Sequence, residues 1–185
     1  MAHPKLKLGL CQILVGRSKP QDLEQAHEAI EKAVAEGANV VMLPECFNCP
    51  YSSNAFPAFQ EDIPDVNSIP DATLHPTSAA VSAWAKEKKI YIVAGSIPER
   101  GPNGMIYNTC AVYDPNGVIV AKHRKAHLFD IDIPGKMTFK ESLTLAPGDQ
   151  ITTFPISLEK LGLGEGDILV GLGICYDIRY ECVFV

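Results

Sequence analysis

The first 43 residues most strongly restrict the fold, because three segments with different hydrophobic periods follow one another directly. Residues 5–13 alternate apolar and polar side chains, which is the period of a strand. Residues 20–35 place apolar side chains at helical spacing, and Gly37 follows as a helix terminator. Residues 39–43 form a continuous apolar run, typical of a strand covered on both faces. A strand, a helix and a buried strand in this order predict a βαβ unit and an α/β fold.

The remaining segments extend this prediction. We expect a second helix at residues 76–89, a buried strand at 90–95 and a final apolar strand at 168–174. Residues 107–113 and 118–122 are predicted to form a hairpin, because Asp-Pro-Asn-Gly at 114–117 is a strong turn signal. Residues 46–70 and 127–149 read as long loops, which in compact domains usually carry function. Without a repeat or a linker, residues 1–185 are predicted to be one domain.

Composition argues against several classes of function. The net charge is -6 and no basic run is interleaved with aromatic residues, so a nucleic-acid partner is not expected. No apolar run reaches the roughly 20 residues that span a bilayer, and the N-terminus lacks a secretory apolar segment. These features predict a soluble protein without a membrane partner, located in the cytoplasm or, alternatively, in mitochondria.

The cysteines and histidines raise the question of a metal or redox site. Six cysteines in a reducing compartment are expected to be free thiols. Cys46 and Cys49 form a C-x-x-C pair, which leaves a redox or zinc-binding module as an alternative, although no second such pair follows. His123 and His127 have a spacing that suits metal ligands but lack an evident third ligand. The sequence therefore predicts no metal site.

Three reactive side chains follow the ends of predicted apolar strands, where ligand sites of α/β sheets lie. Glu45 is a candidate general base, and Lys125 could stabilise an oxyanion. Cys175 follows Gly171 and Gly173, as in a nucleophile elbow. Each of the three also has an ordinary interpretation: a surface glutamate, a lysine in a solvated basic run and a buried structural cysteine.

Taken together, these segments resemble the nitrilase superfamily of carbon-nitrogen hydrolases. The resemblance implies a Glu-Lys-Cys triad in which Glu45 is the base, Lys125 holds the oxyanion and Cys175 is the nucleophile. It also implies an αββα sandwich, a small-molecule amide substrate, assembly as a homo-oligomer when full length, and no cofactor. The segments that carry it are Leu-Pro-Glu-Cys-Phe at 43–47, His-Arg-Lys-Ala-His-Leu-Phe at 123–129 and Gly-Ile-Cys-Tyr-Asp-Ile-Arg at 173–179, with support from 8–12 and 107–109.

Residues 127–142 look most similar to the omega-amidase branch, whose members hydrolyse the terminal amide of 2-oxoglutaramate and 2-oxosuccinamate. Glu141 occupies the place of a second glutamate in that branch, and the resemblance makes it a substrate-orienting residue. Tyr176 is predicted to contribute its backbone N–H to oxyanion and substrate binding. An amidase for another small amide or a carbamoyl compound is the nearest alternative.

The end of the chain departs from this resemblance. In relatives a helix and further strands follow the nucleophile, whereas residues 181–185 here do not continue that pattern. We therefore expect the C-terminal part of the sandwich to be missing and apolar sheet faces to be exposed. A catalytically impaired, truncated form that pairs with a full-length homologue is a further alternative.

Overall fold

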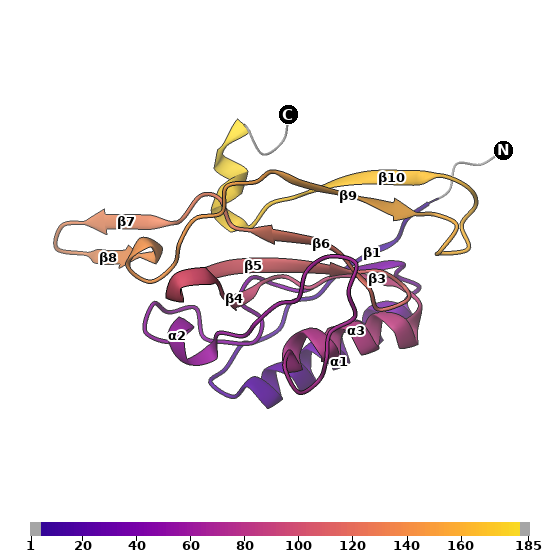
Figure 1. The fold of residues 1–185 in the computed structure, drawn as a ribbon, viewed down its shortest axis with the longest axis horizontal. Helices are drawn as coiled ribbons and strands as arrows, with labels where there is room; N and C mark the ends of the chain where they lie inside the picture. The colour runs from indigo at the N-terminus through magenta and orange to yellow at the C-terminus, as the bar shows by residue number, and fades with distance from the viewer. Residues whose placement is uncertain (1–4, 182–185) are drawn as a thin grey trace.

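The computed structural model describes residues 5–181, so residues 182–185 of the C-terminal segment that departs from the resemblance lie outside the described residues. A six-stranded sheet forms the middle layer (Figure 1). Its strand order is β1-β2-β3-β5-β4, and β6 also pairs with β5. The strands span Leu8–Leu10 (β1), Val40–Met42 (β2), Tyr91–Val93 (β3), Ile97–Arg100 (β4), Ile106–Tyr113 (β5) and Ile119–Arg124 (β6).

The direction of these strands decides where their ends meet. β1, β2 and β3 are parallel, and β5 is antiparallel to both β3 and β6. β6 therefore runs in the same direction as β2, and the residues after both strands reach the same edge of the sheet. The predicted turn joins β5 to β6, and the Asp114 carboxylate accepts hydrogen bonds from the backbone N–H groups of Asn116 at 2.9 Å and Val118 at 3.0 Å.

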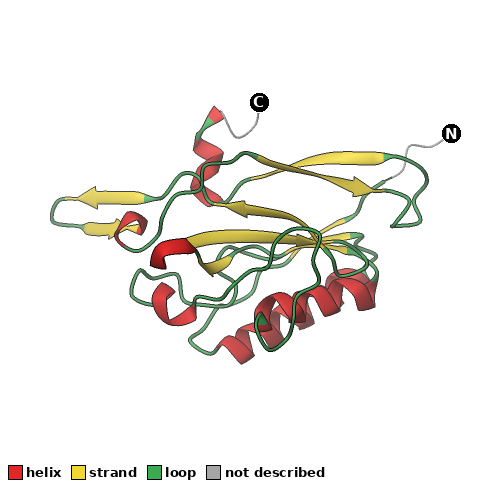
Figure 2. Ribbon diagram, in the orientation of Figure 1, coloured by secondary structure: helices red, strands yellow, loops and turns green. Residues whose placement is uncertain are grey.

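Two helices cover one face of the sheet (Figure 2). Helix α1 spans Lys19–Ala35 and helix α3 spans Pro76–Lys88, each beginning with proline in its first turn, where the missing N–H is tolerated. Ile30 and Val81 are fully buried against Val41 and Ile92 of β2 and β3. The βαβ unit and the second helix are therefore confirmed.

A second, two-stranded sheet covers the other face. Strand β9 (Thr152–Ser157) is antiparallel to β10 (Asp167–Leu172). Phe154 and Ile156 of β9 pack against Val40 and Val112, which completes a sheet-on-sheet core. The predicted α/β class is confirmed, with helices, sheet and second sheet as three layers. A second helix layer, expected for an αββα sandwich, is not found within residues 5–181.

Some predicted loops contain regular structure. Residues 127–149 were expected to be irregular, but they include hairpin β7 (Asp130–Ile133) and β8 (Met137–Lys140) and the 3-10 turn η2 (Glu141–Leu143). The turn between the two strands is closed by Lys136, whose N–H donates to the Ile133 carbonyl at 3.0 Å. The hairpin projects past the end of the large sheet (Figure 1). Short turns also occur at α2 (Phe56–Phe59) and η1 (Pro102–Gly104).

Several apolar side chains of the two sheets are exposed. Leu8 and Leu10 of β1 point to the same side as their neighbours on β2, the side of the second sheet, yet they are 60% and 71% exposed. Leu169 of β10 is 72% exposed, because it points away from the core against which Val170 and Leu172 of the same strand pack. None of the helices in residues 5–181 is long and apolar enough to span a membrane.

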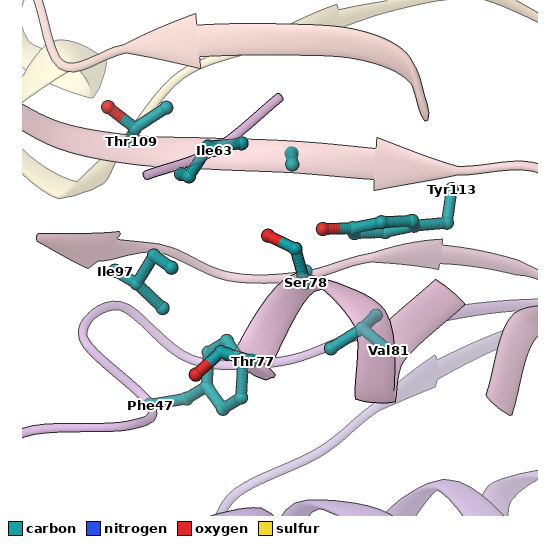
Figure 3. A pocket seen from close by; sticks show the side chains of 10 residues that line it. Phe47, Ile63, Thr77, Ser78, Val81, Ile97, Thr109 and Tyr113 are labelled. Carbon is teal, nitrogen blue, oxygen red and sulfur yellow. The ribbon is translucent and has the colours of Figure 1, made fainter. Parts of the chain in front are cut away.

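A small cavity lies between α3 and the sheet, away from Cys175. Its volume is about 10 Å³, so it can hold at most one water molecule. Figure 3 shows the Tyr113 hydroxyl pointing towards Ser78 at its edge. We regard it as a packing defect of the helix-covered core.

Candidate active site

Glu45 and Lys125 meet at the edge of the large sheet. Glu45 lies just beyond the end of β2, and Lys125 directly follows β6. The Lys125 ammonium donates to Glu45 Oε1 at 2.9 Å. The backbone N–H of Lys125 donates to the Asn108 carbonyl at 2.8 Å, which fixes the lysine to β5. The parallel direction of β2 and β6 thus brings two residues 80 positions apart into contact.

Glu141 supplies a second carboxylate to the same ammonium. Lys125 Nζ donates to Glu141 Oε1 at 2.9 Å, and neither side chain has any solvent exposure. The other oxygen of Glu141 accepts the Phe129 backbone N–H at 2.6 Å. Glu141 reaches this position because hairpin β7-β8 returns the chain to η2, next to Phe129. The hairpin, missed by the sequence analysis, therefore positions a predicted site residue.

The two carboxylates keep Lys125 charged. Burial alone would lower the Lys125 pKa, but the charges and hydrogen bonds of Glu45 and Glu141 outweigh it and raise the pKa above its usual value. A buried lysine between two carboxylates is a fixed positive charge in a site of low dielectric constant. Such a charge is suited to stabilising an anion that develops nearby.

Cys175 begins the 3-10 helix η3 (Cys175–Arg179), three residues after β10. Its φ angle is 48°, in the left-handed region that a non-glycine residue rarely adopts. Strain of this kind is frequent at functional sites. Cys175 is exposed, whereas Cys11, Cys46, Cys49 and Cys110 are buried free thiols. The predicted nucleophile is therefore the accessible thiol within the described part of the chain.

Cys175 and Glu45 line one open cavity of about 260 Å³ between the two sheets. Burial and the nearby charge of Glu45 raise the Cys175 pKa, while the charge of Lys125 acts in the opposite direction. The thiol is thus protonated at neutral pH. It becomes a nucleophile only when a base removes its proton, and Glu45 is the carboxylate beside it.

Gly95 allows the chain to approach Glu45 closely. Its φ angle is 50°, and a Cβ atom at this position would lie 1.9 Å from the carbonyl oxygen of Pro44. Any other residue would push away the backbone that precedes Glu45. Glycine is therefore required at the end of β3 to keep the carboxylate in place.

Two polar residues of the site were not assigned a role from the sequence. Asn108, buried within β5, donates its amide to Glu45 Oε1 at 2.8 Å. Tyr51 donates its hydroxyl to Glu141 Oε1 at 2.7 Å. Burial and this bond to Glu141 raise the Tyr51 pKa far above its usual value, so the hydroxyl remains a donor. A lone asparagine in an apolar strand was the available signal for Asn108, whereas nothing local marks Tyr51.

The other predicted residues lie near this site or flank it. The half-buried Tyr176 packs edge-on against Phe129 at a ring distance of 5.2 Å. Its proposed backbone role in binding stays a prediction. His123 and His127 both face the Asp177 carboxylate, at 3.2 and 2.8 Å. Within residues 5–181 no group of three or more histidine, cysteine or acidic side chains is arranged to hold a metal ion.

The geometry offers the parts needed for acyl transfer: an accessible thiol, a carboxylate beside it and a buried cation. The carbon-nitrogen hydrolase family model matches residues 7–185. The chain belongs to this family. A protein of known structure, Saccharomyces cerevisiae Nit3, a member of branch 10 of the nitrilase superfamily, superposes with a TM-score of 0.77 and 34% identity, over 97% of this chain and 59% of Nit3. The nitrilase-type fold is thereby confirmed.

Curated carbon-nitrogen hydrolases with higher identity are omega-amidases. The mouse (Mus musculus) omega-amidase NIT2 is 45% identical over 174 residues, which are 94% of this chain and 56% of NIT2. The chloroplastic omega-amidase of Arabidopsis thaliana is 44% identical over 177 residues, 96% of this chain and 44% of that protein. The chain thus spans about half the length of the curated relatives that it matches.

Proposed function

We propose that this chain hydrolyses the terminal amide of small 2-oxo acid amides, 2-oxoglutaramate and 2-oxosuccinamate, through a thioester on Cys175. The observation that carries the proposal is the buried Lys125 held by Glu45 and Glu141 at 2.9 Å each, beside an accessible thiol. The similarity to omega-amidases supports the substrate class. The scheme uses no metal ion and no organic cofactor.

In the first step Glu45 accepts the Cys175 proton, and the thiolate attacks the amide carbonyl carbon. The carbonyl oxygen becomes an oxyanion, which the Lys125 ammonium and the Tyr176 backbone N–H stabilise. One donor of this kind contributes roughly 2.7–4 kcal/mol to lowering the barrier. Glu141 keeps the ammonium aimed at the oxyanion by accepting a hydrogen bond from Lys125, and Tyr51 holds Glu141 in place by donating to the same carboxylate oxygen.

In the second step the tetrahedral intermediate collapses. Glu45 returns its proton to the leaving nitrogen, the carbon–nitrogen bond breaks and ammonia departs, leaving a thioester. Glu45 then takes a proton from water, whose oxygen attacks the thioester carbonyl. The carbon–sulfur bond breaks, Glu45 returns this proton to the sulfur to restore the thiol, and the free carboxylic acid leaves. The hydrogen bond from Asn108 holds the Glu45 carboxylate in place for both proton transfers.

The direct test is ammonia release by the 185-residue chain. We expect release from 2-oxoglutaramate and 2-oxosuccinamate, with much slower release from a carbamoyl compound such as an N-carbamoyl amino acid. Release from the carbamoyl compound alone would retain the hydrolase chemistry but overturn the substrate class.

Three further expectations from the sequence stay predictions. They are location in the cytoplasm, assembly as a homo-oligomer and a domain that extends over residues 1–185.

Tyr51→Phe is expected to lower the rate of ammonia release about tenfold, because a hydrogen bond to a buried charged group contributes roughly 1.5–3 kcal/mol. The phenylalanine keeps the ring contacts with Phe56 and Phe139, at 5.9 and 5.3 Å, so the loop stays packed. The measurement is kcat/KM on 2-oxoglutaramate.

Tyr107→Phe is the matched control for this substitution. The Tyr107 hydroxyl contacts the Met105 sulfur at 3.6 Å and takes no part in the hydrogen bonds described above around Lys125. We expect the control to keep its rate within about twofold. Equal rates for both variants and the unmodified chain would show that Tyr51 has no role in orienting Glu141.

A further inference from the structure

Asp177 has an unusual set of partners for a residue outside the triad. Its side chain is fully buried. Its Oδ1 accepts the backbone N–H of His127 at 2.8 Å and lies 2.8 Å from the Nδ1 of the same residue. Its Oδ2 accepts the backbone N–H of Ile174 at 2.9 Å and lies 3.2 Å from His123 Nε2. One buried carboxylate thus joins two segments about 50 residues apart in sequence.

The positions of these partners are informative. Ile174 directly precedes Cys175, and the two histidines stand two residues before and two residues after Lys125. Figure 1 shows η3, which contains Asp177, lying beside the end of β6. The carboxylate therefore joins the turn that carries the thiol to the strand end that carries the ammonium.

We propose that Asp177 is a positioning residue that sets the placement of Cys175 relative to Lys125 and Glu45. This inference rests on the proposed function, because it concerns how the same site is assembled. Asp177 does not touch the reacting atoms and acts through the backbone on either side of them.

Each partner is itself fixed from another direction. His123 is buried in β6, and its Nδ1 lies 3.2 Å from the Thr152 hydroxyl of β9. The His127 ring stacks on Tyr180 at a ring distance of 3.7 Å. Although burial opposes the charged form, the bonds from His123, Ile174 and His127 hold the Asp177 pKa well below its usual range. The anion that makes these contacts is therefore present throughout the neutral pH range.

Asparagine cannot replace this carboxylate. Each oxygen of Asp177 accepts one backbone N–H, so an amide NH₂ on either side would face a donor instead of an acceptor. Asp177→Asn should therefore release either Ile174 or His127 while changing the side-chain volume very little. A displacement of about 1 Å in a catalytic site can lower the rate roughly 100-fold.

The experiment compares Asp177→Asn with the unmodified chain in two assays. The first is kcat and KM on 2-oxoglutaramate, where we expect kcat to fall about 100-fold with KM changed by less than about threefold. The second is the rate of iodoacetamide alkylation at Cys175 across pH, followed by peptide mass spectrometry, where we expect at least a tenfold decrease near neutral pH. The second assay needs no turnover.

Asp114→Asn is the matched control. Asp114 is also buried, accepts two backbone N–H groups and pairs with Lys160, but it lies at the β5-β6 turn, at the other end of β6 from Lys125. Both variants should lower the melting temperature, whereas only Asp177→Asn should change kcat and alkylation. If Asp177→Asn matches the control in both assays, the inference is wrong.

If Asp177→Asn fails to fold, His127→Ala decides the question. It removes the ring contact with Asp177 and keeps the backbone N–H bond, so we expect a smaller decrease of about threefold in kcat and in the alkylation rate. Unchanged values would overturn the inference.

The outcomes also separate the role of Asp177 from the proposed function. An unmodified chain that releases no ammonia, yet shows the expected alkylation difference, would overturn the proposed function and leave the role of Asp177 standing.

Discussion

Cys175→Ala is expected to abolish ammonia release from 2-oxoglutaramate, with a loss on the order of 10⁴–10⁶-fold in kcat. The Cys175 sulfur is the only protein atom in the proposed scheme that forms a covalent bond to the substrate, so no other group can form the thioester in its place. Because Cys175 is exposed, replacing its side chain with the methyl group of alanine creates no cavity in the core. The variant should therefore keep its melting temperature. Coupled ammonia detection and a thermal melt measure the two quantities on one preparation.

Cys11→Ala is the control for a general effect of losing a thiol. Cys11 is a buried free thiol at the end of β1, outside the cavity that Cys175 lines. Its truncation is expected to lower stability slightly and to leave the rate within about twofold. Turnover that persists in Cys175→Ala at more than about one per cent of the original rate would exclude covalent catalysis at this position.

Lys125→Met is expected to lower both the rate and the stability. The rate should fall about 10²–10³-fold, because the oxyanion loses its main donor. The stability should fall by about 3–5 kcal/mol, because methionine leaves the fully buried Glu141 carboxylate and the partly buried Glu45 carboxylate without a cation. Denaturant unfolding at pH 7.5 gives the second quantity.

The pH dependence identifies the cause of that destabilisation. Without Lys125 the Glu45 and Glu141 carboxylates repel each other, and the repulsion is strongest when both are ionised. The destabilisation should therefore decrease as falling pH favours protonation of a carboxylate in the folded variant. We therefore expect the stability difference between the unmodified chain and Lys125→Met to be smaller at pH 5 than at pH 7.5. A constant difference would point to lost packing.

Lys122→Met controls for the loss of a paired lysine, because Lys122 lies in β6, the strand that Lys125 directly follows. Lys122 pairs with Asp65 at 3.2 Å and Glu99 at 3.3 Å, on a side of β6 that does not contribute to the cavity at Cys175. Its replacement should leave the rate within about twofold. An equal loss of rate in both lysine variants would contradict a specific role for Lys125.

The places of Glu45, Lys125 and Cys175 in the fold could be predicted because each residue lies at a strand end that the sequence marks. Glu45, Lys125 and Cys175 follow apolar strands, and the strand directions bring the first two to one edge. The second sheet was harder to predict. Strand β9 contains Pro155, which normally argues against a strand, and it is tolerated because β9 pairs with β10 on one side only.

The parts that were missed depend on contacts between distant segments. Tyr51 reaches Glu141 across 90 residues, and its loop shows no periodicity that would reveal the contact. The hairpin β7-β8 alternates apolar and polar side chains, as Asp-Ile-Asp-Ile and Met-Thr-Phe-Lys, but each strand has only four residues, the shortest run over which alternation indicates a strand. Asp177 sits in a recognisable motif, yet its link to His123 and His127 requires the packed structure.

The central claim is that amide hydrolysis proceeds through a thioester on Cys175, and hydroxylamine trapping tests it most directly. The chain is incubated with 2-oxoglutaramate and hydroxylamine, and the hydroxamate, the ammonia and the mass of the Cys175 peptide after acid quench are measured together. We predict ammonia release, hydroxamate formation in place of part of the acid, and a Cys175 adduct with the mass of the substrate less ammonia. No ammonia release, or release with an unmodified Cys175 and no hydroxamate, would contradict the account.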